Sequence, residues 1–146
     1  MGDTKRSLLE ATFVMVDDDL DQIFSTRRRV RQEGIVNRFV SESRPDRLFE
    51  TLGDLIEMGI DRSSFLLLLD VNMPRESGFQ TLRKIRAHPD FRDMPVLMFS
   101  ASGNESDILE AIDLGCDGYV VKPFTSEEFF SAISSIPQVK KRLLIQ

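Results

Sequence analysis

Short apolar runs alternate with longer segments of helical period along this chain. Apolar runs of four to six residues in such an alternation are typical of strands in a parallel sheet that is covered on both faces. Five runs predict strands at residues 12–16, 36–40, 65–69, 96–99 and 118–121. The second is the weakest prediction, because Asn37 and Arg38 interrupt it.

Each predicted strand is followed by a segment whose apolar residues recur at helical spacing. Asp19 is placed to cap the first predicted helix and Gly34 to end it. The five predicted core-facing stripes are Leu20, Ile23, Phe24 and Val30; Leu48, Leu52, Leu55 and Ile56; Phe79, Leu82 and Ile85; Ile108, Ala111 and Ile112; and Phe129, Ala132, Ile133 and Ile136. The order predicts an α/β domain of the (βα)₅ type. Phe130 lies off the last stripe, which predicts an exposed patch for a partner.

Polar residues follow four of the predicted strands, at the edge where open parallel sheets bind ligands. They are Asp17 and Asp18, Asp70, Ser100 and Lys122. Three carboxylates at one edge repel one another unless a cation neutralises them. Carboxylate oxygens suit Mg²⁺, with Mn²⁺ as a substitute. The pattern therefore predicts a magnesium site.

The same residues also fit phosphoryl transfer. The Asp70 carboxylate can act as a nucleophile and form an aspartyl phosphate. Lys122 and the Ser100 hydroxyl can each bind a phosphoryl oxygen. Charge stabilisation by the cation and the lysine is where most of the catalysis of such a transfer lies.

Composition narrows the class of protein. The length of 146 residues, with 41% hydrophobic and 29% charged residues, fits one globular domain. A net charge of −5 argues against a surface that binds nucleic acid. Cys116 is the only cysteine, so no internal disulfide forms. The longest apolar run, 65–69, is too short to cross a bilayer, and residues 1–10 lack the apolar core of a signal peptide. We therefore expect a soluble cytoplasmic protein with no direct nucleic-acid partner and no membrane insertion.

Four segments resemble the signature segments of response-regulator receiver domains of two-component signalling, of the chemotaxis-regulator kind. They are VDDD (16–19), LLLLDVNMPRESG (66–78), PVLMFSAS (95–102) and GYVVKPF (118–124). The gaps of 30 residues from Asp70 to Ser100 and 22 from Ser100 to Lys122 also match the family pattern. The resemblance covers residues 12–136 and implies a flavodoxin-like, doubly wound sheet with strand order 2-1-3-4-5.

The resemblance also implies a role for each site residue. Asp70 is the phosphoacceptor, Lys122 senses the phosphate, and Ser100 and Tyr119 form the switch, with Ser100 standing where threonine is commoner. The implied metal ligands are Asp17, Asp18, Asp70 and the backbone carbonyl of Asn72, and the Lys122–Pro123 peptide bond is expected to be cis.

These roles imply a stand-alone response regulator rather than an enzyme. It would accept its phosphoryl group from a sensor histidine kinase or a histidine phosphotransfer protein. The face of the fourth helix, fifth strand and fifth helix would then signal to a downstream protein or to a second copy of the chain. We expect an N-terminal extension at 1–10, a receiver domain at 11–137 and a C-terminal tail at 138–146, which is either a disordered end or a stub for contacts.

Two other functions remain open. A phosphohydrolase of the haloacid-dehalogenase kind also uses an Asp nucleophile, Mg²⁺ and a lysine, and the sequence Asp17-Asp18-Asp19 supplies its Asp-x-Asp. That family calls for another acidic pair after the lysine strand, whereas Glu127 and Glu128 fall in a predicted helix, and Asp70 is left without a task. The second alternative is a receiver-like scaffold that is never phosphorylated.

The basic run at 27–31 is expected to be a solvated helix face, with docking of a kinase as its alternative.

Overall fold

Five parallel strands form one sheet in the order β2-β1-β3-β4-β5. The structure is a computed structural model that describes residues 10–146, so the N-terminal extension expected at 1–10 lies, apart from Glu10, outside the described residues. The strands are β1 Thr12–Val16, β2 Phe39–Glu42, β3 Phe65–Asp70, β4 Val96–Ser100 and β5 Gly118–Val121. This order confirms the predicted doubly wound fold.

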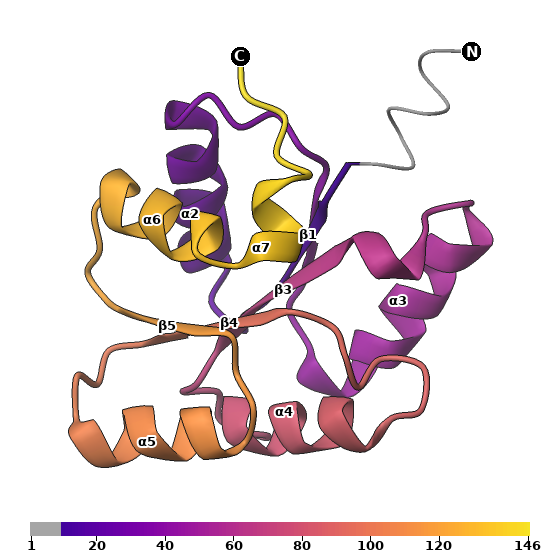
Figure 1. Cartoon of the computed structure of the whole chain (residues 1–146). Coiled ribbons are helices and arrows are strands. Elements are labelled where there is room, and N and C mark those ends of the chain that lie inside the picture. Colours follow the sequence, from indigo (N-terminus) through magenta and orange to yellow (C-terminus); the bar gives the residue numbers. More distant parts are fainter. Residues whose placement is uncertain (1–9) are drawn as a thin grey trace.

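Helices cover both faces of the sheet (Figure 1). On one face lie α2 Leu20–Gln32, α6 Ser126–Ser134 and α7 Pro137–Lys140, and on the other lie α3 Leu48–Glu57, α4 Gly78–Ala87 and α5 Glu105–Asp113. Short 3₁₀ turns at Pro45–Arg47 and Arg62–Ser64 precede α3 and β3. No helix within 10–146 has both the length and the apolar composition needed to cross a bilayer.

The core consists of two apolar clusters, one on each face of the sheet. Alternate residues of β1 point to opposite clusters, with Phe13 and Met15 in one and Val14 and Val16 in the other. Every residue of β1, β3 and β4 is buried. A strand buried on both faces has no polar side, which is why these segments read as continuous apolar runs in the sequence.

The second strand lies further along the chain than predicted. The sequence predicted 36–40, whereas β2 spans Phe39–Glu42. The cause is Asn37, which is fully buried and whose side chain forms hydrogen bonds to two other segments of the chain. Its Nδ2 donates to the carbonyls of Ala11 (2.9 Å) and Arg142 (2.8 Å), and its Oδ1 accepts from the Leu144 amide (2.6 Å). Residues 35–37 therefore hold the C-terminal segment, and bonding to β1 begins at Arg38, whose carbonyl accepts from the Phe13 amide (2.9 Å).

The C-terminal segment packs onto the domain. Val139 is buried in the core and Leu143 packs against the same cluster. The Val36 amide donates to the Leu144 carbonyl (2.8 Å), and Ile35 and Ile145 form an antiparallel bridge. Residues 138–146 thus contact their own domain along most of their length.

Some predicted helix faces are too wide. Leu20 and Phe24 are 69% and 70% exposed, because α2 buries the narrower stripe of Ile23, Thr26 and Val30. Ile56 and Ile112, at the edges of their stripes, are exposed as well. The prediction for Phe130 is wrong in the opposite sense, because its ring is partly buried against the core cluster. The neighbouring element, rather than the spacing, decides whether a side chain at the edge of an apolar stripe is buried.

Candidate functional site

The carboxyl ends of β1 and β3 bring three carboxylates together. Each of Asp17, Asp18 and Asp70 offers an oxygen within 4.8 Å of the others. Asp17 and Asp70 are buried and Asp18 is exposed. Because β1 and β3 are paired neighbours in the sheet, groups far apart in the sequence meet at this edge.

Asp17 is the most constrained of the three. Its side chain is fully buried, and its Oδ1 accepts a hydrogen bond from the Asp19 amide (2.9 Å). Its Oδ2 has no hydrogen-bond partner among the described residues. Burial raises the pKa of Asp17 to about 6, and the neighbouring charges of Asp70 and Asp18 add to the rise.

A buried carboxylate oxygen without a hydrogen-bond partner is costly unless another charge compensates it. Lys122 Nζ lies 3.5 Å from Asp17 Oδ2, an ion-pair distance without hydrogen-bond geometry. Two further carboxylates face the same space, so the donor set is oxygen-only and strongly negative. Such a set fits a hard divalent cation such as Mg²⁺.

Lys122 joins the two buried carboxylates. Its Nζ donates to Asp70 Oδ1 (3.3 Å) in addition to its contact with Asp17. Lys122 follows β5, and its peptide bond to Pro123 is cis. Its ammonium is thus held beside Asp70, where a phosphoryl group on that residue would lie.

Close packing of the backbone fixes the position of Asp70. Gly78, the first residue of α4, donates its amide to the Val71 carbonyl (2.9 Å). A Cβ at Gly78 would overlap the carbonyl oxygen of Asp70 and lie 2.8 Å from the Cα of Val71. Only glycine therefore lets α4 approach the end of β3 this closely. The loop between them is closed by a capping box, in which Ser77 and Gln80 exchange hydrogen bonds.

Ser100 is fully buried at the end of β4. Its Oγ accepts hydrogen bonds from the Ser102 amide (3.0 Å) and from Asn72 Nδ2 (3.3 Å). Both bonds use lone pairs of the hydroxyl oxygen, so its hydrogen can turn toward a phosphoryl oxygen.

Tyr119 is partly buried and connects to Ser100 through one residue. Its hydroxyl donates to the Ser102 carbonyl (3.1 Å), and the Ser102 amide donates to Ser100. Burial raises the pKa of the Tyr119 hydroxyl. A movement of Ser100 would therefore reach Tyr119 through Ser102.

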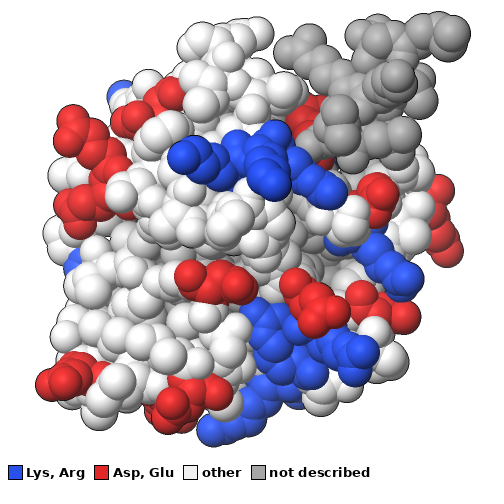
Figure 2. Space-filling view, in the orientation of Figure 1, with Lys and Arg blue, Asp and Glu red and all other residues white. Residues whose placement is uncertain are grey.

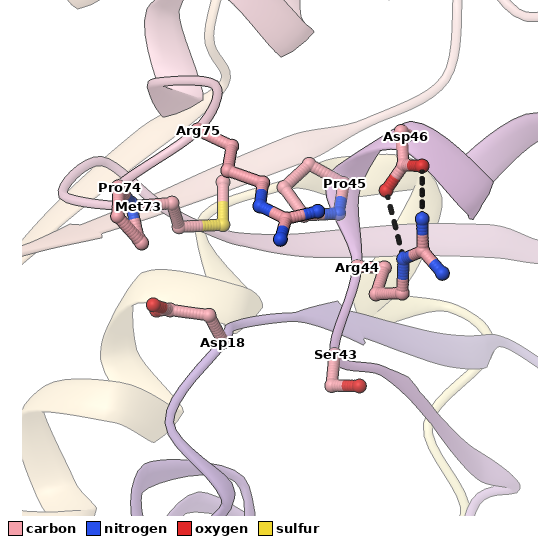
Figure 3. Close-up of a pocket in the computed structure, with 8 residues that line it drawn as sticks. All are labelled: Asp18, Ser43, Arg44, Pro45, Asp46, Met73, Pro74 and Arg75. Carbon is pink, nitrogen blue, oxygen red and sulfur yellow. Dashed lines mark hydrogen bonds and ion pairs between the residues drawn. The ribbon is translucent and has the colours of Figure 1, made fainter.

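Two hollows adjoin the carboxylates. One, of about 320 Å³, is lined by all the predicted metal-site residues together with Asp19, Gln22, Ala101 and Lys122. The other, of about 270 Å³, lies between Asp18 and the loops that carry Arg44 and Arg75 (Figure 3). Arg44 forms an ion pair with Asp46 (2.7 Å) at its rim. Sequence analysis missed this second hollow, and the only signal for it was the unusual length of the segment from 41 to 64.

The acidic residues that a phosphohydrolase would need are used elsewhere. Asp19 caps α2 by accepting from the amides of Asp21 (2.9 Å) and Gln22. Glu128 belongs to the capping box of α6, and both Glu127 and Glu128 are exposed on that helix. Neither provides the additional acidic pair at the site.

The basic run at 27–31 is largely engaged within the fold. Arg27 and Arg29 each lie over a phenylalanine ring, 5.0 and 4.9 Å from its centroid. Arg31 donates to the carbonyls of residues 35 and 37 (2.8 and 2.9 Å). Arg27 and Arg31 are nevertheless exposed, as expected of a solvated helix face, whereas Arg29 is partly buried, and the contacts of all three hold α2 against its neighbours.

Comparisons with known proteins find relatives over most of this chain. A sequence model of the response regulator receiver domain matches residues 13–134. The transcriptional regulatory protein GltR of Pseudomonas aeruginosa is 30% identical over 125 residues, which cover 86% of this chain and 48% of GltR. CpxR of Escherichia coli K12 is 34% identical over 123 residues, which cover 84% of this chain and 47% of CpxR.

A solved receiver domain from Rhodospirillum rubrum is 26% identical with a TM-score of 0.67, covering 92% of this chain and 96% of that one. The chain spans about half the length of the curated relatives it matches.

Proposed function

This chain belongs to the response regulator receiver domain family of two-component signalling, and from that premise we propose that it accepts a phosphoryl group on Asp70 in a Mg²⁺-dependent reaction. The observation that carries the proposal is the convergence of three carboxylate oxygens within 4.8 Å, with the Lys122 ammonium 3.3 Å from Asp70. Charges that repel one another at this distance are explained by a site that binds a divalent cation and a phosphate.

In the proposed reaction, the carboxylate of Asp70 attacks the phosphorus of a phosphohistidine on a sensor kinase or a phosphotransfer protein. An O–P bond forms at Asp70, the P–N bond breaks, and the histidine leaves. Asp17, Asp18, Asp70 and the carbonyl of Asn72 would hold the Mg²⁺, which supplies charge neutralisation when bound. Lys122, whose ammonium contacts both Asp70 and Asp17, would hold a phosphoryl oxygen. The chain is an acceptor in this reaction and not an enzyme with its own substrate.

The phosphoryl group would then change the surface through Ser100. Turning the Ser100 hydroxyl toward the phosphoryl group weakens its bond to the Ser102 amide, and Ser102 in turn holds Tyr119. The change therefore arrives at α5, β5 and α6. We propose that a receiver unit at 11–137, with the segment 138–146 packed onto it, signals in the cytoplasm through this face.

Incubation with Mg²⁺ and acetyl phosphate, followed by intact-mass measurement, tests the proposal. We expect one labile phosphoryl adduct on the wild-type chain, none on Asp70→Asn, and strongly reduced labelling of Asp17→Asn. Asp19→Asn is the matched control. Asp19 lines the same hollow but is not among the three carboxylates whose oxygens converge, and Asn also caps helices well, so labelling should persist.

Other outcomes identify the alternatives. Turnover of generic phosphomonoesters that survives Asp70→Asn but not Asp17→Asn would indicate a phosphohydrolase. A correctly folded chain with neither labelling nor turnover would indicate a scaffold.

A further inference from the structure

The surface formed by α5, β5 and α6 is rich in acidic residues, of which Glu110 and Asp117 pair with Arg83 (3.5 Å) and Arg86 (3.1 Å) of α4. Within residues 103–135 the only basic residue is Lys122, which lies in the phosphoacceptor site. The same segment contains seven acidic residues, namely Glu105, Asp107, Glu110, Asp113, Asp117, Glu127 and Glu128. It therefore has a net charge of −6, whereas the whole chain has −5. In Figure 2 red side chains lie over α6 and α5, with white surface between them.

The same surface exposes apolar side chains. Leu109 and Ile112 on α5 are 51% and 57% exposed, and Val121 on β5 is 37% exposed. A groove of about 590 Å³ runs between β5 and α6, lined in part by Tyr119 and Glu127. Strand β5 is at the edge of the sheet and pairs with β4 only, so its outer backbone groups are free within this face. Apolar surface framed by charge is typical of a docking site.

Four of these acidic residues suit their helices, because Glu105 and Asp107 lie in the first turn of α5 and Glu127 and Glu128 in the first turn of α6, near the positive end of each helix dipole. In α2 and α4 the last turn carries basic residues, which suit the negative end of the helix dipole. Neither α5 nor α6 has a basic residue in its last turn, and α5 ends on Asp113. An acidic residue there faces the negative end of the helix dipole and lowers the stability of the helix. The helix dipole therefore does not favour the charge of Asp113.

The charge of this surface also decides which kind of partner can bind it. A two-fold dimer through this face would place it against itself, because such an interface uses the same patch on both copies. Glu127 would then lie near acidic groups of the second copy, with no exposed basic residue of α5, β5 or α6 to compensate. We infer that this face takes a basic partner segment carrying apolar side chains, and not a second copy of the chain. The inference rests on the proposed function, in which this face is the one that signals.

A peptide-display selection tests the inference without knowledge of the partner. The probe is a library of random 12-residue peptides with no charge bias, panned on the full chain with Mg²⁺ and beryllofluoride as a phosphoryl mimic. We expect the enriched peptides to carry net positive charge together with leucine or aromatic residues. Their affinity should fall as salt rises, because the contacts between exposed charges are screened.

Paired charge reversals locate the binding. The double variant Asp113→Lys/Glu127→Lys should weaken an enriched peptide at least 10-fold, and its α5 should be no less stable, because lysine suits the end of that helix. The matched control is Asp54→Lys/Glu57→Lys on α3, which connects β2 and β3 near the other edge of the sheet. This control changes the net charge equally, and we expect the affinity to stay within twofold.

Several results would overturn the inference. They are enrichment of neutral or acidic peptides, no enrichment at all, equal losses in the two double variants, or dimerisation of the activated chain that Asp113→Lys/Glu127→Lys abolishes. Phosphoryl labelling of Asp70 is measured separately. Failure of labelling with selection of basic peptides would refute the proposed function alone, and labelling with selection of neutral peptides would refute the inference alone.

Discussion

Asp17 should destabilise the metal-free protein, and Asp17→Asn should therefore make that form more stable. The carboxylate is fully buried, and one of its oxygens has no hydrogen-bond partner among the described residues. Asn keeps an oxygen that can accept the hydrogen bond from the Asp19 amide, and it removes the charge. The variant thus isolates the cost of burying this charge beside Asp18 and Asp70.

The direction in which stability changes with pH follows from the pKa of Asp17. The pKa of Asp17 is about 6 in the folded protein against a reference of 3.8. Between these values the folded state binds more protons than the unfolded state, so the contribution of Asp17 to stability falls as pH rises. Asp17 leaves the free energy of unfolding unchanged below about pH 4, and it lowers this free energy by the full amount above about pH 7. The difference between variant and wild type should therefore be small at pH 4 and large at pH 7.5.

The magnitude follows from the same shift. A rise of about two pKa units corresponds to about 3 kcal/mol in the free energy of unfolding. Asn is itself a buried polar group and retains part of that cost, so we expect a net gain of about 1–3 kcal/mol at pH 7.5.

Urea unfolding in EDTA at pH 4.5 and pH 7.5 measures this difference. Repeating the titration in Mg²⁺ should stabilise the wild type by ligand linkage and leave Asp17→Asn nearly unchanged. Asp19→Asn, at an exposed cap, is the control, and we expect it to follow the wild type in both conditions. A variant that is less stable than the wild type at pH 7.5 in EDTA, or equally stabilised by Mg²⁺, would refute the reasoning.

Three further substitutions and one control at an exposed residue test contacts that hold the fold, each read by urea unfolding. Gly78→Ala should cost about 1–3 kcal/mol, because its Cβ would overlap the Asp70 carbonyl; no loss would show that α4 can move away freely. Arg86→Ala should cost about 2–4 kcal/mol, since its guanidinium donates to three backbone carbonyls and one carboxylate between α4 and β5; an effect below 1 kcal/mol would mean that water replaces these bonds. Asn37→Ala should cost a similar amount and free the C-terminal segment to proteolysis, whereas Phe24→Ala, at a site 70% exposed, should change stability by less than about 0.5 kcal/mol.

Sequence could predict the parts of this fold that depend on continuous burial. Strands buried on both faces show as apolar runs, so β1, β3, β4 and β5 lie within one residue of the predicted ranges. The site followed from the same fact, because the residues after those strands meet at one edge. The role of Asn37 in holding the C-terminal segment could not be predicted, since it depends on carbonyl groups at 11 and 142 that are far away in the sequence. The exposure of Phe24 escaped prediction for a related reason, because spacing alone does not tell which part of an apolar stripe meets another helix.

The attachment of α5 suggests how phosphorylation of Asp70 would reach the surface formed by α5, β5 and α6. Only Ala111 of this helix is buried, so little apolar contact holds it to the sheet. The segment that follows its C-terminal end is held by Arg86, which donates to the Gly115 carbonyl and pairs with Asp117 (3.1 Å). The opposite end follows the loop that begins at Ser102, whose amide is bonded to Ser100. A helix held at one end and weakly packed along its length can pivot, so we expect the N-terminal end of α5 to move most when Ser100 turns.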